Sequence, residues 1–380
     1  MNKNAKTLWG LVAIVVVVGL VWYGASSRQT KQTVRLGFVG PLTGDVAVLG
    51  VPMQKAALLA QEEINAAGGV GGKPLDIKFE DGLCNGKDAA QATQKLLGID
   101  GVKFIIGGSC SGEMLAMAPL VANGEAVLIS PSATSPKITT AGDFVFRNAP
   151  SDALQAAVMA RYAYQKLGLK KAAVISENTD YGQGLREAFK KSWSDFTGQI
   201  TADEVYNTGE TDFRTVAKKL TQDSPEAIYI VPNSPASGLL IAKQVRGVGY
   251  QGQLLTAEVL VNNETAKEAS VQGLIHTDIA FGSSAKTKIF LDAYKARYGT
   301  EPEYKMFVAN TYTLVYLFKE AIEKAGENTA KVRDFLYDLK DWDSAVGKLT
   351  FDKNGDPASA SYAIKKVLKG EDTEVEVVTP

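Results

Sequence analysis

The sequence predicts an α/β protein with two domains. Short apolar runs of the kind that form buried strands alternate with segments whose apolar residues recur at helical spacing. A chain of 380 residues, 45% of them hydrophobic, is also too long for one ordinary hydrophobic core. A second series of strands and helices starts near residue 153, so we expect a second α/β domain to begin there.

An apolar segment precedes the first predicted strand. Residues 7–27 carry no charge, and Leu8 to Gly24 is almost continuously apolar after Lys3 and Lys6. The apolar core of a signal peptide usually has about 7 to 15 residues, whereas a membrane-spanning helix needs roughly 17 to 25. The length favours a retained anchor in the cytoplasmic membrane, with cleavage near Ser26 as the alternative. The two lysines place the body of the protein outside the cytoplasm, in the periplasm or at the cell surface.

Strands and helices alternate from residue 34 onward in the first domain. The expected strands are Val34 to Val39, Leu75 to Glu80, Phe104 to Ile106, Val127 to Ile129 and Phe144 to Arg147. Helices are expected over Met53 to Ile64, Lys87 to Leu97 and Ser111 to Asn123. Apolar residues at helical spacing favour these helices, and Pro52 suits the first turn of the first one.

The second series follows the same alternation. Its expected strands are Ala172 to Ser176, Ile200 to Tyr206, Ala227 to Val231, Leu254 to Ala257 and Leu274 to Ile279. Helices are expected from Ala153, over Gly184 to Phe196, Phe213 to Gln222 and Ser237 to Val248, and then over Lys286 to Tyr298, Met306 to Lys324 and Thr329 to Leu339. A late hairpin of Lys348 to Phe351 with Tyr362 to Val367 is expected around Asn354-Gly355, because Asn-Gly favours tight hairpin turns.

The composition argues against several classes of function. A net charge of -1 does not suit a nucleic-acid binder, which needs a basic surface. His276 is the single histidine, which argues against a histidine general base and a multi-histidine metal site. We find no Gly-x-Ser-x-Gly elbow, dinucleotide fingerprint or phosphate loop. We therefore expect no enzyme, no metal and no cofactor.

Hydroxyl side chains follow two neighbouring strands of the predicted sheet. Ser111 opens the helix after Phe104 to Ile106, and Ser132 and Thr134 follow Val127 to Ile129. Parallel strands joined by a helix bring both loops to the carboxyl edge of the sheet, where open α/β folds bind ligands. Ser111 stands where an N-cap would, beside unpaired helix N–H groups, so a carboxylate could dock there. The alternative is that these hydroxyls cap a helix and a turn and bind nothing.

Several short phrases occur in a fixed order along the chain. They are Gly-Pro-Leu-Thr-Gly at 40 to 44, Glu-Ile-Asn-Ala-Ala-Gly-Gly-Val at 63 to 70, Ser-Pro-Ser-Ala-Thr-Ser-Pro at 130 to 136, Arg-Asn-Ala-Pro-Ser-Asp at 147 to 152, Tyr-Gly-Gln-Gly at 181 to 184 and Thr-Asp-Phe at 211 to 213. Their order and spacing resemble those of the Leu/Ile/Val-binding, type I periplasmic substrate-binding proteins of ABC amino-acid importers. The resemblance covers roughly Val34 to Val367.

The resemblance implies a fold of two Rossmann-like lobes with three crossings between them and the ligand in the cleft. Residues 1–33 would be the membrane or signal segment with its linker. Lobe one would comprise 34–152 plus 281–347, and lobe two 153–280 plus 348–380.

The resemblance also implies a set of ligand contacts. Ser111 and Thr134 would hold a ligand carboxylate, and the Ser132 carbonyl and Glu258 would take an ammonium group. Tyr181 would close over the ligand from lobe two. Without the resemblance, Glu258 would be read as a solvated surface carboxylate and Tyr181 as an ordinary loop aromatic.

The two cysteines form a further pair to consider. They are too few for a four-cysteine metal site, and in an oxidising compartment Cys84 and Cys110 could form a disulfide, with two free buried thiols as the alternative. The resemblance implies that they are joined.

Leu49 departs from the family pattern, because the best known members carry a pocket-lining aromatic residue at this position. It suggests an apolar or uncharged ligand end. The resemblance implies an extracytoplasmic solute-binding protein that delivers a small amino acid, branched-chain or otherwise apolar, to ABC permease subunits. The alternatives are a ligand-binding sensor and a binding protein for amides, urea or small carboxylates.

Overall fold

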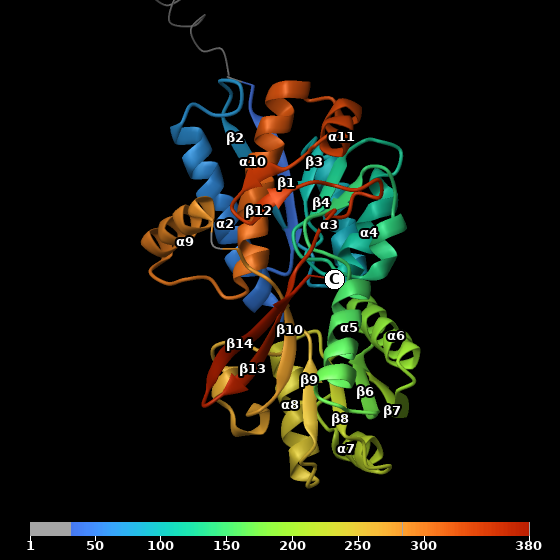
Figure 1. Ribbon diagram of the computed structural model, residues 1–380. Helices are drawn as coiled ribbons and strands as arrows, with labels where there is room; N and C mark the ends of the chain where they lie inside the picture. Colours follow the sequence, from blue (N-terminus) through green and yellow to red (C-terminus); the bar gives the residue numbers. More distant parts are fainter. Residues whose placement is uncertain (1–31, 283, 380) are drawn as a thin grey trace, which may run out of the picture.

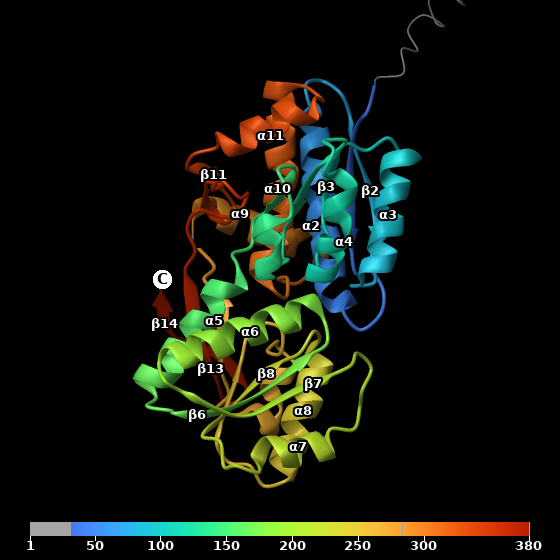
Figure 2. The ribbon, with the colours of Figure 1, turned by 90° about the vertical axis from the view of Figure 1, so that its right-hand side faces the viewer.

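Residues 32–282 and 284–379 are described by a computed structural model, in which this part of the chain forms two α/β lobes stacked end to end (Figures 1 and 2). The α/β class and the two-lobe division predicted from the sequence are confirmed. The predicted membrane segment, Leu8 to Gly24, lies outside the described residues. In 32–282 and 284–379, no helix combines the length and the apolar character that crossing a membrane requires.

The first lobe is organised around a parallel sheet in the order β2-β1-β3-β4-β5. Its strands are β1 (Val34–Gly40), β2 (Leu75–Asp81), β3 (Phe104–Ile106), β4 (Val127–Ser130) and β5 (Val145–Arg147). Its helices are α2 (Ala47–Ala66), α3 (Gly86–Gly98) and α4 (Ser111–Val121), joined later in the chain by α9 (Ala285–Tyr298), α10 (Lys305–Ala325) and α11 (Thr329–Tyr337). The predicted strand–helix order is confirmed, with small shifts at the ends.

Both faces of this sheet are buried, which explains the continuous apolar runs of its strands. Phe104 and Ile106 of β3 belong to the core shared with α2 and α10, while Ile105 between them packs with α3 and α4. Successive strand residues point to opposite faces, so each face supplies its own core. The parallel strands β3 and β4 end at the same edge of the sheet, and the loops after them line a cavity together with residues of the other lobe.

The second lobe has a mixed sheet in the order β14-β13-β10-β9-β8-β6-β7. Its strands are β6 (Lys171–Glu177), β7 (Gln199–Tyr206), β8 (Ala227–Val231), β9 (Gln253–Thr256), β10 (Ile275–Ile279), β13 (Tyr362–Leu368) and β14 (Glu371–Val378). Its helices are α5 (Asp152–Arg161), α6 (Asp180–Asp195), α7 (Arg214–Thr221) and α8 (Pro235–Gly247). β13 runs antiparallel to both β10 and β14, whereas the earlier strands are parallel.

Two local predictions are wrong. The expected late hairpin does not form, because β12 (Gly347–Leu349) pairs with β11 (Trp342–Ser344) and β13 pairs with β10 and β14. Pairing of β13 with the distant strand β10 thus prevails over the hairpin that Asn354-Gly355 favours. Pro52 lies inside α2 rather than in its first turn, because the helix already begins at Ala47.

The turn around Asn354-Gly355 serves a different purpose: it packs on β5. The carbonyl of Gly355 accepts from the N–H of Arg147 at 3.0 Å, and a Cβ at Gly355 would lie 2.6 Å from the carbonyl oxygen of Val145. Gly355 also has a φ of +77°, so glycine is favoured on both grounds. The segment from Phe351 to Asp356 is therefore attached to the first lobe, and the chain crosses to the second lobe after it.

Candidate ligand-binding site

The residues predicted to contact a ligand surround one cavity between the lobes. The first lobe contributes Leu49, Ser111, Ser132 and Thr134, and the second contributes Tyr181 and Glu258. The space between atoms is about 490 Å³, part of it open at the mouth of the cleft. The volume that the centre of a water molecule can reach is about 40 Å³, so little of this space is enclosed.

Bonds across the cleft hold the lobes close together. The ammonium of Lys137, in the loop after β4, lies 2.9 Å from Oδ1 of Asp180 at the start of α6. The hydroxyl of Tyr304 donates to the carbonyl oxygen of Val259 at 3.0 Å. The lobes are therefore in a closed arrangement around the cavity.

The hydroxyls of the first lobe are held by the backbone around them. Ser132 donates to the carbonyl oxygen of Ser109 at 2.6 Å, and Ser111 Oγ accepts from the N–H of Ser135 at 3.1 Å. Because the oxygen of Ser111 acts as acceptor in this bond, its proton can be donated to another group. Ser111 is the first residue of α4, so the N-terminal N–H groups of this helix lie beside it. This edge of the cavity suits an anion.

One detail of the helix start was predicted wrongly. The N-cap of α4 is Cys110, not Ser111, and the carboxylate of Glu113 accepts from the N–H of Cys110 at 2.9 Å. Helix ends read from a sequence are commonly displaced by a residue or two. The displacement frees the hydroxyl of Ser111 from a capping role.

Thr134 connects the hydroxyl edge to a buried carboxylate. Its hydroxyl donates to Oδ2 of Asp152 at 2.8 Å, and both side chains are buried. Asp152 begins α5, directly after the crossing from β5. Because a hydroxyl has a single proton, Thr134 cannot donate to Asp152 and to a ligand carboxylate at the same time.

Glu258 lines the cavity from the second lobe. Its side chain is 4% exposed and accepts from Nε2 of Gln155 at 2.5 Å and from the hydroxyl of Tyr181 at 3.2 Å. Burial raises the pKa of Glu258 to about 7, although the bond from Gln155 favours its charged form. A buried carboxylate in this state gains from a cationic partner.

Asp152 adds a second carboxyl group behind the lining residue Thr134. Burial and the neighbouring charge of Glu258 raise the pKa of Asp152 well above its usual range. Asp152 Oδ1 and Gln155 Oε1 are buried and have no hydrogen-bond partner among the residues that the structure describes. These free acceptors, together with Glu258, suit a group that brings N–H donors and positive charge, such as an ammonium group.

The remaining walls of the cavity are mostly apolar. Residues of this kind from both lobes are Val46, Val48, Leu49, Cys110, Pro235, Val259 and Phe307. Leu49 is half-buried in α2, and Phe307 near the start of α10 is buried. These residues give the cavity an apolar wall that includes Leu49.

The loop that carries Ser132 and Thr134 is fixed from behind by a buried ion pair. Arg147 Nε lies 2.6 Å from Oδ1 of Asp356, and Nη2 lies 2.7 Å from Oδ2. Nη1 of Arg147 also donates to the carbonyl oxygen of Ser135 at 2.9 Å. The guanidinium is fully buried, so its pairing geometry sets the position of the loop.

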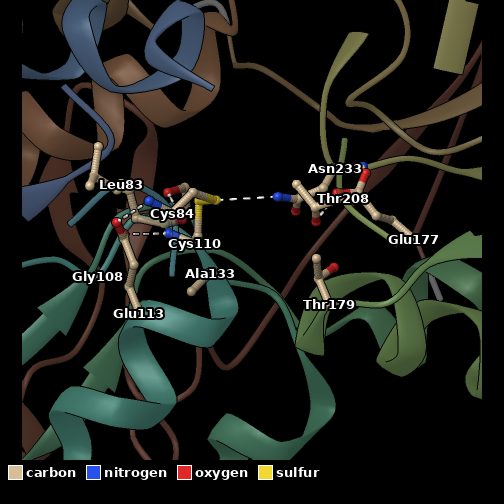
Figure 3. Close-up of a disulfide and its surroundings, with 12 residues drawn as sticks. Leu83, Cys84, Gly108, Cys110, Glu113, Ala133, Glu177, Thr179, Thr208 and Asn233 are labelled. Atoms are coloured by element: carbon tan, nitrogen blue, oxygen red, sulfur yellow. Dashed lines mark hydrogen bonds between the residues drawn. A yellow bond between two sulfur atoms is a disulfide. The ribbon is translucent and has the colours of Figure 1, made fainter. Parts of the chain in front are cut away.

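The predicted disulfide between Cys84 and Cys110 is confirmed, with the two Cα atoms 5.3 Å apart. Figure 3 shows Glu113 beside it, where the carboxylate accepts from the N–H groups of Cys84 and Cys110, each at 2.9 Å. The disulfide joins the loop after β2 to the start of α4. It thereby fixes a wall of the cavity.

Sequence reasoning missed several residues at this site. Asp152 is the last residue of the phrase Arg-Asn-Ala-Pro-Ser-Asp. Its position directly after the predicted crossing between the lobes was a signal that it lies near the cleft. Gln155 follows one helical turn later on α5, and this spacing is the signal that was available. Phe307 and Asn233 come from distant segments, and no local pattern marks them as neighbours of Ser111.

Comparisons with known proteins agree with this geometry. The family model described as "Periplasmic binding protein" matches residues 33–372. The leucine-, isoleucine-, valine-, threonine- and alanine-binding protein of Pseudomonas aeruginosa is 31% identical, over 96% of this chain and 96% of the relative. The Leu/Ile/Val-binding protein homolog 3 of Brucella melitensis is 33% identical, over 96% of this chain and 97% of the relative.

A solved structure is similar over nearly the same length. It is the branched-chain amino acid transporter substrate-binding protein LivJ from Streptococcus pneumoniae in complex with isoleucine. Its TM-score is 0.82 and its identity 30%, and the match covers 92% of this chain and 100% of that chain.

Proposed function

The chain belongs to the periplasmic binding protein family, and from this membership and the chemistry of the cleft we propose that it captures a branched-chain or other small apolar amino acid and delivers it to an ABC transporter permease. The family binds its substrates for transport and is not enzymatic. The recognition signal for the permease would be the closure of the lobes around the ligand.

The observation that carries the proposal is the pairing of opposite chemical ends in one cavity. Ser111 and the N-terminus of α4 offer donors from the first lobe, while Glu258 offers a buried carboxyl group from the second lobe, with Asp152 behind the lining residue Thr134. An α-amino acid presents an anion and a cation, and both need partners once they leave water. The apolar wall between these ends suits an aliphatic side chain.

We assign the contacts as follows. Ser111 and Thr134 hold the carboxylate, and the Ser132 carbonyl and Glu258 take the ammonium. Tyr181 covers the ligand from α6, and Leu49 contacts its side chain. The bond between Thr134 and Asp152 would change partner on binding, which leaves Asp152 available to the ammonium.

The cellular context is part of the proposal. A body outside the cytoplasm, attached through Leu8 to Gly24, would keep the protein beside its permease. For the lobes we propose a boundary at 280/281, and because α5 begins at Asp152 we move the first boundary from 152/153 to 151/152. The contacts of Phe351 and Asp356 with β5 favour moving the third boundary from 347/348 to about residue 358.

A thermal-shift screen tests the function, because a ligand that binds the native state raises the melting temperature. Full-length protein would be tested against the twenty amino acids, small amides, urea and small carboxylates. We expect the largest shifts with isoleucine, leucine or valine. Shifts produced by amides or simple carboxylates, with none from amino acids, would contradict the assignment.

A further inference from the structure

A side chain of the second lobe reaches across the cleft to the disulfide. Asn233, in the loop after β8, donates from Nδ2 to Sγ of Cys84 at 3.3 Å (Figure 3). A disulfide sulfur has no proton and can only accept, so the amide of Asn233 has to present its NH₂ group. The contact joins residues 149 positions apart, on opposite sides of the cleft.

The second-lobe side of this contact is held in place. The N–H of Asn233 donates to Oε2 of Glu177 at 3.0 Å, and Glu177 is 3% exposed. The same carboxylate accepts from the hydroxyls of Tyr206 at 3.0 Å and Thr208 at 2.6 Å. Glu177 and Thr208 are seen behind Asn233 in Figure 3. The loop is thus oriented toward the first lobe by hydrogen bonds to Glu177 within its own lobe.

The first-lobe side is held by a different set of bonds. Leu83 and Cys84 have φ values of 50° and 57°, a left-handed conformation that is unfavourable for residues other than glycine. The bond from Cys84 N–H to Glu113 at 2.9 Å and the disulfide to Cys110 keep the segment in this conformation. The position of the accepting sulfur is therefore determined by the covalent link.

The contact lies beside the proposed ligand. Asn233 and Cys110 both line the ligand cavity, and Asn233 and Cys84 both line the adjoining mouth of the cleft. Opening the lobes would separate the amide from the sulfur, whereas the bonds of Glu177 and Glu113 lie each within one lobe and would survive. The bond between Asn233 and the disulfide therefore forms on closure.

We propose that Asn233 is a positioning residue that stabilises the closed cleft by donating to the Cys84–Cys110 disulfide, so that this disulfide supports ligand retention as well as the stability of the fold. The inference rests on the proposed function, because retention is measured with an amino acid. Neutral sulfur is a weak acceptor, so we expect an effect of roughly three- to tenfold on affinity.

A double-mutant cycle tests the proposal on the full-length protein. Binding and dissociation of L-isoleucine would be measured for wild type, Asn233→Ala, the disulfide-free Cys84→Ala/Cys110→Ala variant and the combination of all three. We expect Asn233→Ala to weaken binding roughly three- to tenfold in the oxidised protein, mainly through faster dissociation. In the disulfide-free background the same substitution should change affinity less than about twofold. An equal loss in both backgrounds, or no loss in the oxidised protein, overturns the proposal.

A matched control tests whether the effect is specific to Asn233, and a second variant tests the contact without removal of the disulfide. Asn178 lines the same cleft mouth, but its amide donates to Asn207 within the second lobe at 3.2 Å, so Asn178→Ala should leave affinity unchanged. If the disulfide-free variant does not fold, Asn233→Asp decides the question. A carboxylate places an acceptor against the sulfur, so this variant should bind more weakly than Asn233→Ala, and wild-type affinity would overturn the proposal.

Two readings separate failure of the proposed contact from failure of the function. Melting of the unliganded Asn233→Ala variant should match wild type, because the contact forms on closure. If wild type binds isoleucine and Asn233→Ala binds equally well, the closing contact is wrong and the function stands. If wild type binds none of isoleucine, leucine, valine and alanine, the proposed function fails and the inference fails with it.

Discussion

The two lobes supply opposite kinds of chemistry to the cleft. In the first lobe, Ser111 and Ser132 are neutral and already bonded to backbone groups, and the disulfide fixes the adjoining wall. On the other side, Glu258 and the first residue of α5, Asp152, are buried carboxyl groups with raised pKa values. The hydroxyl groups of the first lobe therefore have hydrogen-bond partners without a ligand, whereas a cationic ligand would stabilise the buried carboxyl groups on the other side.

This difference suggests how binding and closure are linked. A preorganised donor set costs little to maintain and can hold one end of a ligand in an open cleft. The buried carboxyl groups become favourable only when a cation shares their environment. In the proposed contacts, the ligand ammonium would supply the counter-charge that makes the closed arrangement favourable.

The largest expected effect is the loss of charge at the second-lobe end. Glu258→Gln keeps the shape but removes the counter-charge of the ammonium, and loss of a buried charge partner costs about 2 to 5 kcal/mol. We expect amino acid affinity at pH 8 to fall roughly 30-fold to several thousand-fold by calorimetry. An affinity within about threefold of wild type would remove the ammonium role from Glu258.

The disulfide offers a test of the first lobe as a rigid unit. The bond closes a loop with a sequence separation of 26 residues, and its removal should lower the free energy of unfolding by roughly 3 to 4 kcal/mol in the loop-entropy description. Denaturant unfolding of Cys84→Ala/Cys110→Ala gives the loss. Hydrogen exchange should locate faster opening in peptides of residues 75–121. An equal increase in hydrogen exchange throughout the second-lobe sheet would mean that the disulfide does not stabilise the first lobe selectively.

The pH dependence should have opposite signs for binding and for stability. Burial raises the pKa of Glu258 from its usual 4.5 to about 7, so the unliganded fold binds this proton more tightly than the unfolded chain does. Its contribution to unliganded stability is therefore present below pH 4.5 and is lost as the pH rises through 7. If Glu258 pairs with the ligand ammonium as proposed, binding requires the ionised form, so affinity should instead rise, by about tenfold between pH 6 and pH 8.

Calorimetry across this range measures the effect, and Glu258→Gln is the control in which it should be much smaller. The groups that act on Glu258 include Asp152 and Asp278, which are negative when ionised, and the hydroxyl of Tyr181. Burial raises the pKa of Glu113 to about 7 as well. The pH dependence of the free energy of unfolding would therefore combine the contributions of Glu113 and Glu258. Affinity that fell as the pH rose toward 8 would contradict the ionised role of Glu258 in binding.

The smallest effect is expected at the hydroxyl end. Thr134→Ala removes a donor that has Asp152 as an alternative partner, so we expect a loss of about 1 kcal/mol, roughly fivefold in affinity. Thr134→Ser retains the hydroxyl and is the matched control. A loss as large as that of Glu258→Gln would show that the first lobe carries the dominant interaction and would reverse the comparison.

The sequence predicted those elements of the fold whose pattern lies within one short segment, and it failed where an element depends on distant parts of the chain. β3 and β4 are buried on both faces and read as apolar runs, so their positions were predictable. β14 was missed, because its charged residues, the exposed Glu371 and Glu374 and the half-buried Glu376, lack the apolar pattern of an inner strand, as is common at sheet edges. The pairing of Tyr362–Leu368 with β10 joins distant segments, which a turn motif cannot reveal.

The site shows the same limit. Ser111, Ser132 and Thr134 were brought together by reasoning about the edge of one sheet. The bond between Thr134 and Asp152, and the position of Gln155 beside Glu258, depend on how the lobes meet. Such contacts follow from tertiary packing and have no counterpart in spacing along the chain.

The late return of the chain to both lobes has a consequence for how the protein is made. α9, α10 and α11 complete the first lobe only after residue 285, and β13 and β14 complete the second-lobe sheet after residue 362. During synthesis neither lobe can bury its full core until most of the polypeptide has emerged, since essential partners are translated last. Late folding keeps the nascent chain unfolded for longer. Translocation across a membrane in extended form requires such an unfolded chain.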